Sequence, residues 1–171
     1  EQWAGAACVS TCMDDRVTRA RAESARLWLN LGQPLRAADN LRWLSRLHWY
    51  RCEPDQARYQ GLRAIELLIQ TDDERAIALA KALQAQLLFL ELRIDEAIGF
   101  AKSAVSVARS SGSVEAEVHA LNTLGSALCF LDQPEGVAQV RQSIELAERA
   151  EVSPPTVTRW NSSAATGAAP S

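Results

Sequence analysis

The cysteines and histidines are the side chains best suited to metal binding or nucleophilic chemistry. Cys8 and Cys12 lie four residues apart and would share one face of a helix, while the other two cysteines stand far along the chain. A structural zinc site needs about four such ligands, and His48 and His119 fall in different apolar segments. We interpret the cysteines as small buried side chains and predict neither a metal site nor a cofactor.

Catalytic patterns are equally sparse. Neither histidine belongs to a recognisable motif with a nucleophile and an acid, and His48 stands where a large buried side chain is expected. His119 precedes Leu121 by two residues and is expected to face the concave surface of the repeat. Both lysines, Lys81 and Lys102, lie outside any Gly-x-x-x-x-Gly-Lys-Ser/Thr loop, so no nucleotide-phosphate cradle is expected. We predict that the chain is not an enzyme.

Charge and apolar run length limit the partners and the cellular compartment that we expect for this chain. The formal net charge is −3, so the chain carries no overall basic footprint for nucleic acid. The longest strongly apolar run, residues 87–90, is far shorter than the roughly 20 residues that span a bilayer. The sequence shows no signal peptide and starts at Glu1, so we expect a cytoplasmic piece of a longer protein with no membrane contact.

A repeated pattern of polar pair, small residue and apolar helix face occurs four times. The pattern is anchored on Ala20, Ala57, Ala97 and Val137, whose numbers differ by nearly equal intervals (57 − 20 = 37, 97 − 57 = 40, 137 − 97 = 40). Two helices and a short turn require an interval of this size. Small residues at these anchors, and Gly125 within the last pair, are expected to let paired helices approach closely. Such pairs stack into a curved solenoid with an inner concave surface.

Apolar residues recur three and four apart between the anchors, which predicts an all-α fold. Gly, Pro and Ser clusters mark the helix ends, and Asp72 or Asp73, and also Ser113, are expected to cap the helices that follow. The predicted helices span residues 16–31, 36–52, 55–70, 74–92, 95–110, 114–131 and 135–150. These form one domain, 1–150, followed by a flexible tail over 151–171.

The residues 121–128, Leu-Asn-Thr-Leu-Gly-Ser-Ala-Leu, resemble the first helix of a tetratricopeptide repeat. The stretches 12–16, 27–32 and 40–49 are similar to the helical-repeat region of large bacterial regulators that also carry an ATP-binding module and a LuxR-type DNA-binding domain. This resemblance covers residues 12–150 and implies a right-handed α-solenoid of about three and a half antiparallel helix pairs. Lys81 and Gln84 depart from it, because they stand where large apolar residues are expected.

Binding of a protein or peptide partner, or of a neighbouring regulator domain, is the function we predict. In repeats of this kind the concave surface is lined by first-helix residues; here these are Asp39, Arg42, Arg46, Trp49, Gln86, Phe89, His119, Asn122 and Ser126. Arg42 and Arg46 lie one turn apart and could both hold a carboxylate, with Trp49 as an apolar anchor. The alternative is that both arginines are solvated or paired with Asp39.

Two further functions remain open from the sequence. Residues 147–160 resemble the core of a helix-turn-helix, in which Thr156 and Arg159 would face DNA. Glu151 stands where that turn usually has glycine, and no third helix follows, so we expect nucleic-acid binding less than protein binding. The other alternative is a structural spacer that forms homo-oligomers through the uncapped apolar faces of its terminal repeats.

Overall fold

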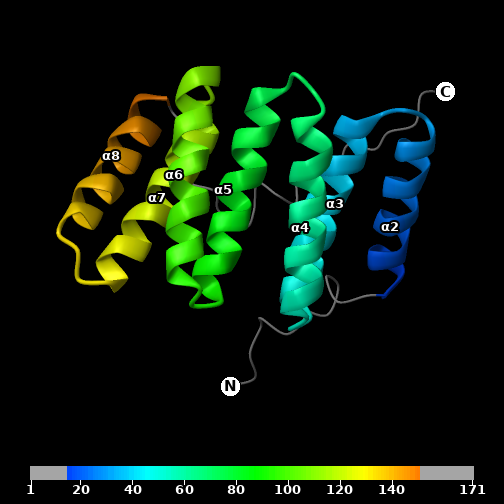
Figure 1. Cartoon of the computed structure of the whole chain (residues 1–171), viewed down its shortest axis with the longest axis horizontal. Coiled ribbons are helices and arrows are strands. Elements are labelled where there is room, and N and C mark those ends of the chain that lie inside the picture. The colour runs from blue at the N-terminus through cyan, green and yellow to red at the C-terminus, as the bar shows by residue number, and fades with distance from the viewer. Residues whose placement is uncertain (1–14, 151–171) are drawn as a thin grey trace.

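Seven α-helices make up residues 15–150, the part of the chain that this computed structural model describes (Figure 1). They are α2 (Asp15–Asn30), α3 (Pro34–Tyr50), α4 (Pro54–Ile69), α5 (Glu74–Leu90), α6 (Ile94–Ser111), α7 (Val114–Phe130) and α8 (Glu135–Arg149). Each predicted helix is confirmed to within two residues at both ends, and the all-α class is confirmed for the described part. None of these seven helices combines the length and the apolarity needed to cross a membrane.

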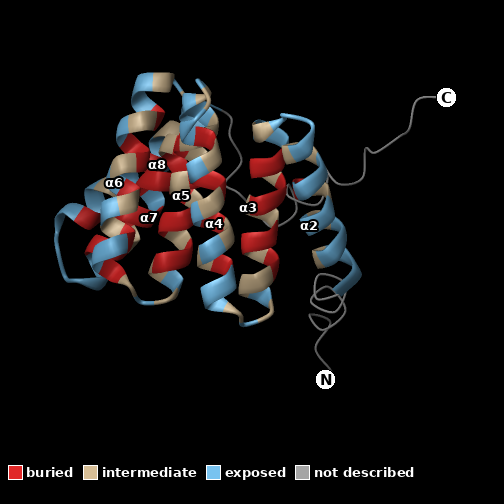
Figure 2. Cartoon of the chain, turned by 45° about the vertical axis from the view of Figure 1, so that its right-hand side comes forward, coloured by how far each residue is buried: buried red, intermediate tan, exposed pale blue. Residues whose placement is uncertain are grey.

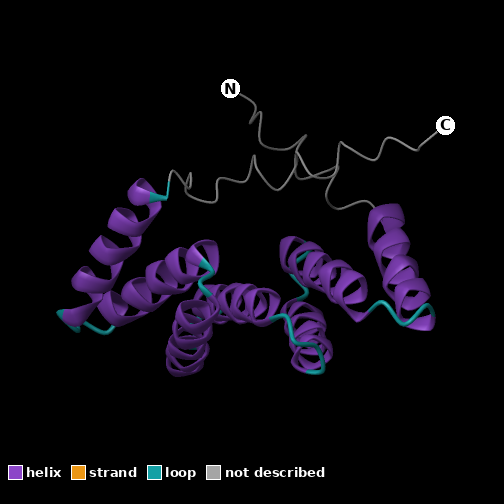
Figure 3. Ribbon diagram, turned by 90° about the horizontal axis from the view of Figure 1, so that it is seen from above, coloured by secondary structure: helices purple, strands orange, loops and turns teal. Residues whose placement is uncertain are grey.

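The helices follow one another along a single arc. Each packs against the next helix in the chain, and α5 also packs against α7. Seen from above, α3, α5 and α7 form an inner row on the concave side, and α4 and α6 form an outer row, with α2 and α8 at the two ends (Figure 3). The inner row is the surface that the sequence predicted for partner binding.

Alanine dominates the core between these rows. More than half of the buried hydrophobic residues are alanines, among them Ala57, Ala64, Ala97 and Ala101, none of which is exposed at all. The buried positions gather where helices face one another (Figure 2). Small side chains let helix backbones approach, and the larger buried leucines, such as Leu121, each contribute about 2–3 kcal/mol of hydrophobic stabilisation.

Five of the six turns between the described helices share one conformation. In each, one residue adopts a left-handed backbone, with φ between 55° and 66°: Gly32, Cys52, Leu92, Gly112 and Asp132. The next residue donates its N–H to the carbonyl five positions earlier, as Glu53 does to His48 at 3.0 Å. This is the Schellman arrangement, which satisfies the last carbonyls of a helix. These five positions recur at one interval or at its double, so each helix with its turn occupies nearly the same length of chain.

The sixth turn, between α4 and α5, is built differently. Thr71 donates its hydroxyl to the carbonyl of Leu68 at 2.7 Å, and the Asp73 carboxylate caps α5 by accepting from the Ala76 N–H at 2.9 Å. The predicted cap is therefore Asp73. Ser113 forms no side-chain cap hydrogen bond, so the second capping prediction was wrong.

Two of the four repeat anchors are confirmed. Ala57 and Ala97 are completely buried, but Ala20 lies exposed on α2 and Val137 is 57% exposed. In α8 the buried small residue near the start of the helix is Gly136 instead of Val137. The Gly136 N–H donates to the carbonyl of Gln133, three residues earlier. The N–H groups of Ala57 and Ala97 donate to carbonyls four residues earlier, at Glu53 and Arg93. That tighter first turn shifts the buried face of α8 by one residue.

Gly125 and Gly136 lie where the backbones of α7 and α8 approach closely. A Cβ on Gly125 would lie 2.7 Å from the Gly136 carbonyl oxygen and 2.8 Å from the Val140 nitrogen. A Cβ on Gly136 would lie 2.6 Å from the Cys129 nitrogen. The role predicted for Gly125, close approach within its own helix pair, is therefore confirmed.

Candidate partner-binding surface

The predicted inner-surface residues occupy related positions on α3, α5 and α7. Arg46, Gln86 and Ser126 recur at the two-helix interval, one on each of these helices, and all three are half-buried. Trp49 and Phe89 are related in the same way. Because the three helices form the inner row (Figure 3), this spacing repeats one set of positions along the concave side.

Arg42 and Asp39 form an ion pair with each other. The Nη2 atom of Arg42 lies 2.6 Å from Oδ1 of Asp39, and the Arg42 side chain is only 16% exposed. For Arg42, the alternative interpretation that it pairs with Asp39 is therefore the correct one. A carboxylate from a partner would compete with Asp39 for this guanidinium group, so Arg42 is poorly placed as a principal binding residue.

Arg46 lies one turn further along α3. Its guanidinium carbon lies 5.7 Å from the centre of the Tyr50 ring, on the same helix. Arg46 also lines a small cavity between α3, α4 and α5, and its charge acts on His119 of α7. Arg46 therefore lies beside α5 and close enough to α7 for its charge to act on His119.

His119 is buried, which corrects its prediction as a surface residue. Only 7% of the residue is exposed, and its Nδ1 atom has no hydrogen-bond partner among the described residues. Burial, followed by the nearby charge of Arg46, lowers the pKa of His119 to about 4, because a low-dielectric site disfavours the charged imidazolium. At neutral pH His119 is therefore uncharged and serves packing between the helices.

The predicted inner-surface residues of α7 are polar. Asn122 is exposed, and the Ser126 hydroxyl donates to the Asn122 carbonyl at 2.8 Å. Phe89 of α5 stacks edge-to-face on Phe130 of α7, with ring centres 6.4 Å apart. These side chains offer hydrogen-bonding groups and one aromatic surface, but no charge.

A cavity of about 20 Å³, roughly the space of one water molecule, lies where α3 and α5 approach each other. Gln84 forms one wall; it is 2% exposed and its Oε1 atom has no hydrogen-bond partner among residues 15–150. Opposite stand Ser45, whose hydroxyl donates to the Ala57 carbonyl at 2.6 Å, and Gly61. The sequence flagged Gln84 as polar at an apolar position, and this was the available signal for the cavity.

Lys81, the other departure from the apolar pattern, is half-buried and donates from Nζ to the Ser103 hydroxyl at 2.9 Å.

His48 is half-buried as well, and its Nδ1 atom lies 2.6 Å from the Glu53 carboxylate. Hydrogen bonds from His48 and then from Arg51 lower the pKa of Glu53. Both residues have structural partners.

The remaining predicted sites are partly outside the described chain. Cys8 and Cys12 lie outside the described residues. Thr156 and Arg159 lie outside them as well, so only residues 147–150 of the predicted helix-turn-helix are described. Within residues 15–150 no three or more His, Cys, Asp or Glu side chains cluster as metal ligands. Cys52 and Cys129 are exposed free thiols, which corrects their interpretation as buried side chains.

Comparison with known proteins identifies a shared fold. No protein-family model matches the sequence, and no curated protein matches it. Among solved structures, the chain is similar to the crystal structure of BtubC (BKLC) from P. vanneervenii, with a TM-score of 0.71 and 18% sequence identity. The match covers 81% of this chain and 58% of that chain, so this chain spans little more than half the length of BtubC. At this identity the likeness concerns the fold alone.

Proposed function

We propose that this chain is a non-catalytic, tetratricopeptide-like scaffold that binds a protein or peptide partner on its inner surface. The observation that carries the proposal is the repetition of Arg46, Gln86 and Ser126 at one position of three successive inner helices. A surface that repeats along an arc suits an extended segment, because successive helices meet successive residues of the ligand.

The repeat assignment is part of the proposal. The left-handed turn positions recur at a regular interval, with one helix and turn to each unit and two units to each pair. This regularity supports a solenoid of about three and a half antiparallel pairs, and the shared fold with BtubC is consistent with it. We propose a right-handed superhelix, as in other tetratricopeptide arrays.

The wider setting is also proposed. The similarity of residues 12–16, 27–32 and 40–49 to the repeat region of LuxR-type, ATP-binding regulators supports a place in a bacterial transcriptional regulator of the cytoplasm. The ATP-binding and DNA-binding steps would then belong to other domains. This region would hold a partner protein or a neighbouring domain.

Peptide display against the immobilised chain tests the function directly. Selected peptides should bind the unaltered chain and lose binding to a triple variant of the inner row, Arg46→Asp, Gln86→Asp and Ser126→Asp. The control carries Gln56→Asp, Arg63→Asp and Ser106→Asp on α4 and α6, which changes the net charge equally at exposed or half-buried outer positions. Equal loss of binding in the two variants, or no enrichment of any peptide, would rule out the inner surface.

Self-association is a second candidate function, favoured by exposed apolar side chains at the two ends of the arc. Leu27 and Leu31 of the α2 end are 48% and 66% exposed, and Val137 and Ile144 of α8 are 57% and 53% exposed. A second copy could cover these faces. Sedimentation at increasing concentration should then show a rising mass, which Ile144→Glu abolishes; a constant monomer mass excludes this function.

A further inference from the structure

Charge is distributed unevenly between the two halves of the arc. Residues 15–70, which form α2–α4, hold ten Arg against six Asp or Glu, a net charge of +4. Residues 71–150, which form α5–α8, hold seven Lys or Arg against twelve Asp or Glu, a net charge of −5. The overall charge of −3 conceals this separation, which favours a negatively charged ligand at the α2–α4 end.

Arginine and aromatic side chains alternate where α2 meets α3. Arg21 of α2 lies over the Trp43 ring at 5.2 Å and donates to Asn40 Oδ1 at 3.2 Å. Arg36 of α3 lies over the Trp28 ring of α2 at 4.5 Å. Together with the pair of Arg46 and Tyr50, these residues form what we call the arginine–aromatic strip: Arg21, Trp28, Arg36, Trp43, Arg46 and Tyr50.

Most of the strip lies along one side of α3, a helix of the inner row, where α3 meets α2. Positions 36, 43 and 50 are seven residues apart and so share one face of α3, and positions 21 and 28 do the same on α2. Helix α3 belongs to the inner row (Figure 3). Trp43 and Arg46 also line the cavity that separates α3 from α5. The strip therefore continues the proposed binding surface toward the α2 end.

The guanidinium groups of Arg21 and Arg36 keep hydrogen-bonding capacity. Arg21 and Arg36 form no ion pair with any carboxylate among the described residues; their contacts are the two tryptophan rings and Asn40. A ring stacked on one face of a guanidinium group leaves the in-plane N–H donors pointing outward, in the fork that matches a carboxylate. Arg36 is exposed and both tryptophans are half-buried, so charge and apolar surface are presented together.

We propose that the arginine–aromatic strip binds an acidic peptide segment of a partner protein, with carboxylates on Arg21 and Arg36 and apolar side chains against Trp28 and Trp43. This inference rests on the proposed function and names the partner's chemistry and the part of the inner surface that it uses. The neutral inner surface of α5 and α7, with Gln86 and Asn122, extends the site without adding charge.

An acidic peptide fits this surface better than a single-stranded nucleic acid. A long polyanion such as a single-stranded nucleic acid would run onto the half of the arc with net charge −5. A short acidic segment can avoid that half.

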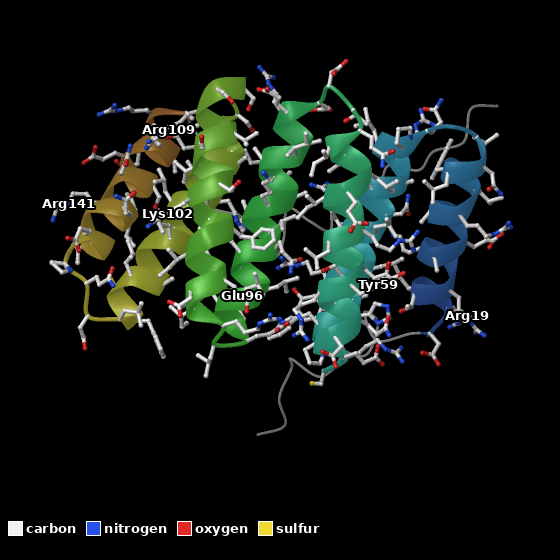
Figure 4. The ribbon with its side chains drawn as sticks, viewed as in Figure 1. Arg19, Tyr59, Glu96, Lys102, Arg109 and Arg141 are labelled. Carbon is white, nitrogen blue, oxygen red and sulfur yellow. The ribbon has the colours of Figure 1, made fainter. Side chains whose placement is uncertain are left out.

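Arg63 provides a matched control for the strip. It lies over the Tyr59 ring at 5.7 Å, so it too is an arginine stacked on an aromatic side chain. It belongs to α4 in the outer row, and Tyr59 is labelled on that helix in Figure 4. Arg36→Gln and Arg63→Gln therefore remove the same charge from the two opposite sides of the arc.

Fluorescence anisotropy tests the proposal with a labelled twelve-residue peptide of alternating acidic and leucine or phenylalanine residues. Losing one charge-assisted hydrogen-bonded pair should weaken binding by roughly 10-fold in Arg36→Gln, and by less than about 2-fold in Arg63→Gln, which affects only long-range charge. Arg36→Lys keeps the charge without the fork and should give an intermediate affinity. Circular dichroism melts check that all variants remain folded.

Three results would overturn the inference. One is equal affinity for the acidic probe and for its glutamine and asparagine counterpart. Another is equal weakening by Arg36→Gln and Arg63→Gln, or no binding of the probe up to roughly 1 mM. The third is tighter, Arg36-dependent binding of a single-stranded oligonucleotide. If one of these results is found while display-selected neutral peptides still need Arg46, Gln86 and Ser126 for binding, the strip assignment fails but the proposed function stands.

Discussion

Helices α7 and α8 meet at two glycines, whereas α3 and α5 face each other across a small cavity beside a buried glutamine. The same two-helix period runs through both regions: Leu44 and Leu124 are buried at one position of α3 and α7, and Gln84 stands at that position in α5. The α7–α8 contact is closed by backbone on backbone. One region therefore supplies tight packing, and the other keeps polar and aromatic side chains on the inner surface.

Glycine-to-alanine substitutions should separate the two regions most strongly. Gly125→Ala should destabilise the fold by roughly 3 kcal/mol, because its Cβ would meet backbone atoms at 2.7 and 2.8 Å that cannot move independently. Gly61→Ala should cost less than about 1 kcal/mol, because its nearest clash is the end of the Gln84 side chain and alanine favours the helix. Urea unfolding measures both.

An equal loss of stability in the two alanine variants would show that the α3–α4–α5 region is packed as rigidly as the α7–α8 contact. Ser126→Ala, at the position next to Gly125 on α7, serves as the control. It should leave the free energy of unfolding nearly unchanged, because its hydroxyl bonds only to Asn122 in its own helix.

His119 should make the stability of the fold depend on pH. The pKa of His119 is about 4 in the folded chain and 6.5 when unperturbed. Between pH 4 and pH 6.5 the imidazole is therefore protonated in the unfolded chain but neutral in the folded chain. The stabilisation is complete above pH 6.5 and declines as the pH falls toward 4, by up to about 3 kcal/mol. His119→Gln should remove this part of the slope. An unchanged slope in the variant would assign it to carboxylates elsewhere.

Replacing Gln84 should strengthen the loose region. Gln84→Leu removes a buried oxygen without a hydrogen-bond partner in the described chain and restores the residue type found at positions 44 and 124. We expect a gain of about 1 kcal/mol. Denaturant titration of this variant, compared with Gln86→Leu at a half-buried position on α5, measures it. Destabilisation would show that the amide group is hydrogen-bonded in solution.

The turns after α3 and after α5 should respond alike, since they share one geometry. Cys52 and Leu92 adopt φ of 59° and 61°, which glycine accepts without steric cost. Cys52→Gly and Leu92→Gly should each raise stability by about 0.5 kcal/mol, since relief of strain exceeds the entropy lost on ordering glycine. Differential scanning calorimetry should show two small increases in Tm; a decrease in either would mean that its side chain contributes more than its backbone strain costs.

The helices were predictable because their signals are local. Apolar residues three and four apart, with Gly and Pro at the ends, located all seven described helices within two residues. Gly125 was recognisable because a glycine within an apolar helix has few other purposes. Gln84 was visible as a polar residue in an apolar register.

The errors concern how helices meet. Ala20 and Val137 matched the repeat pattern, but the one-residue shift at Gly136 depends on a tighter turn that the pattern does not encode. The burial of His119 depends on which neighbouring side chains occupy the adjacent space. The ion pair of Arg42 with Asp39 was one of the alternatives that the sequence left open. The arginine–aromatic strip joins residues from two helices, so neither helix shows it alone.

The most direct test of the account is NMR chemical-shift mapping of the ¹⁵N-labelled chain during titration with the acidic twelve-residue peptide. We predict that the largest perturbations lie on α2 and α3 around Arg21, Arg36 and Trp43, and extend to residues 80–87 of α5. Smaller changes are expected on α7. Perturbations centred on α4 and α6, or on α8, would contradict the account, because the ligand would then occupy the outer row or the end of the arc.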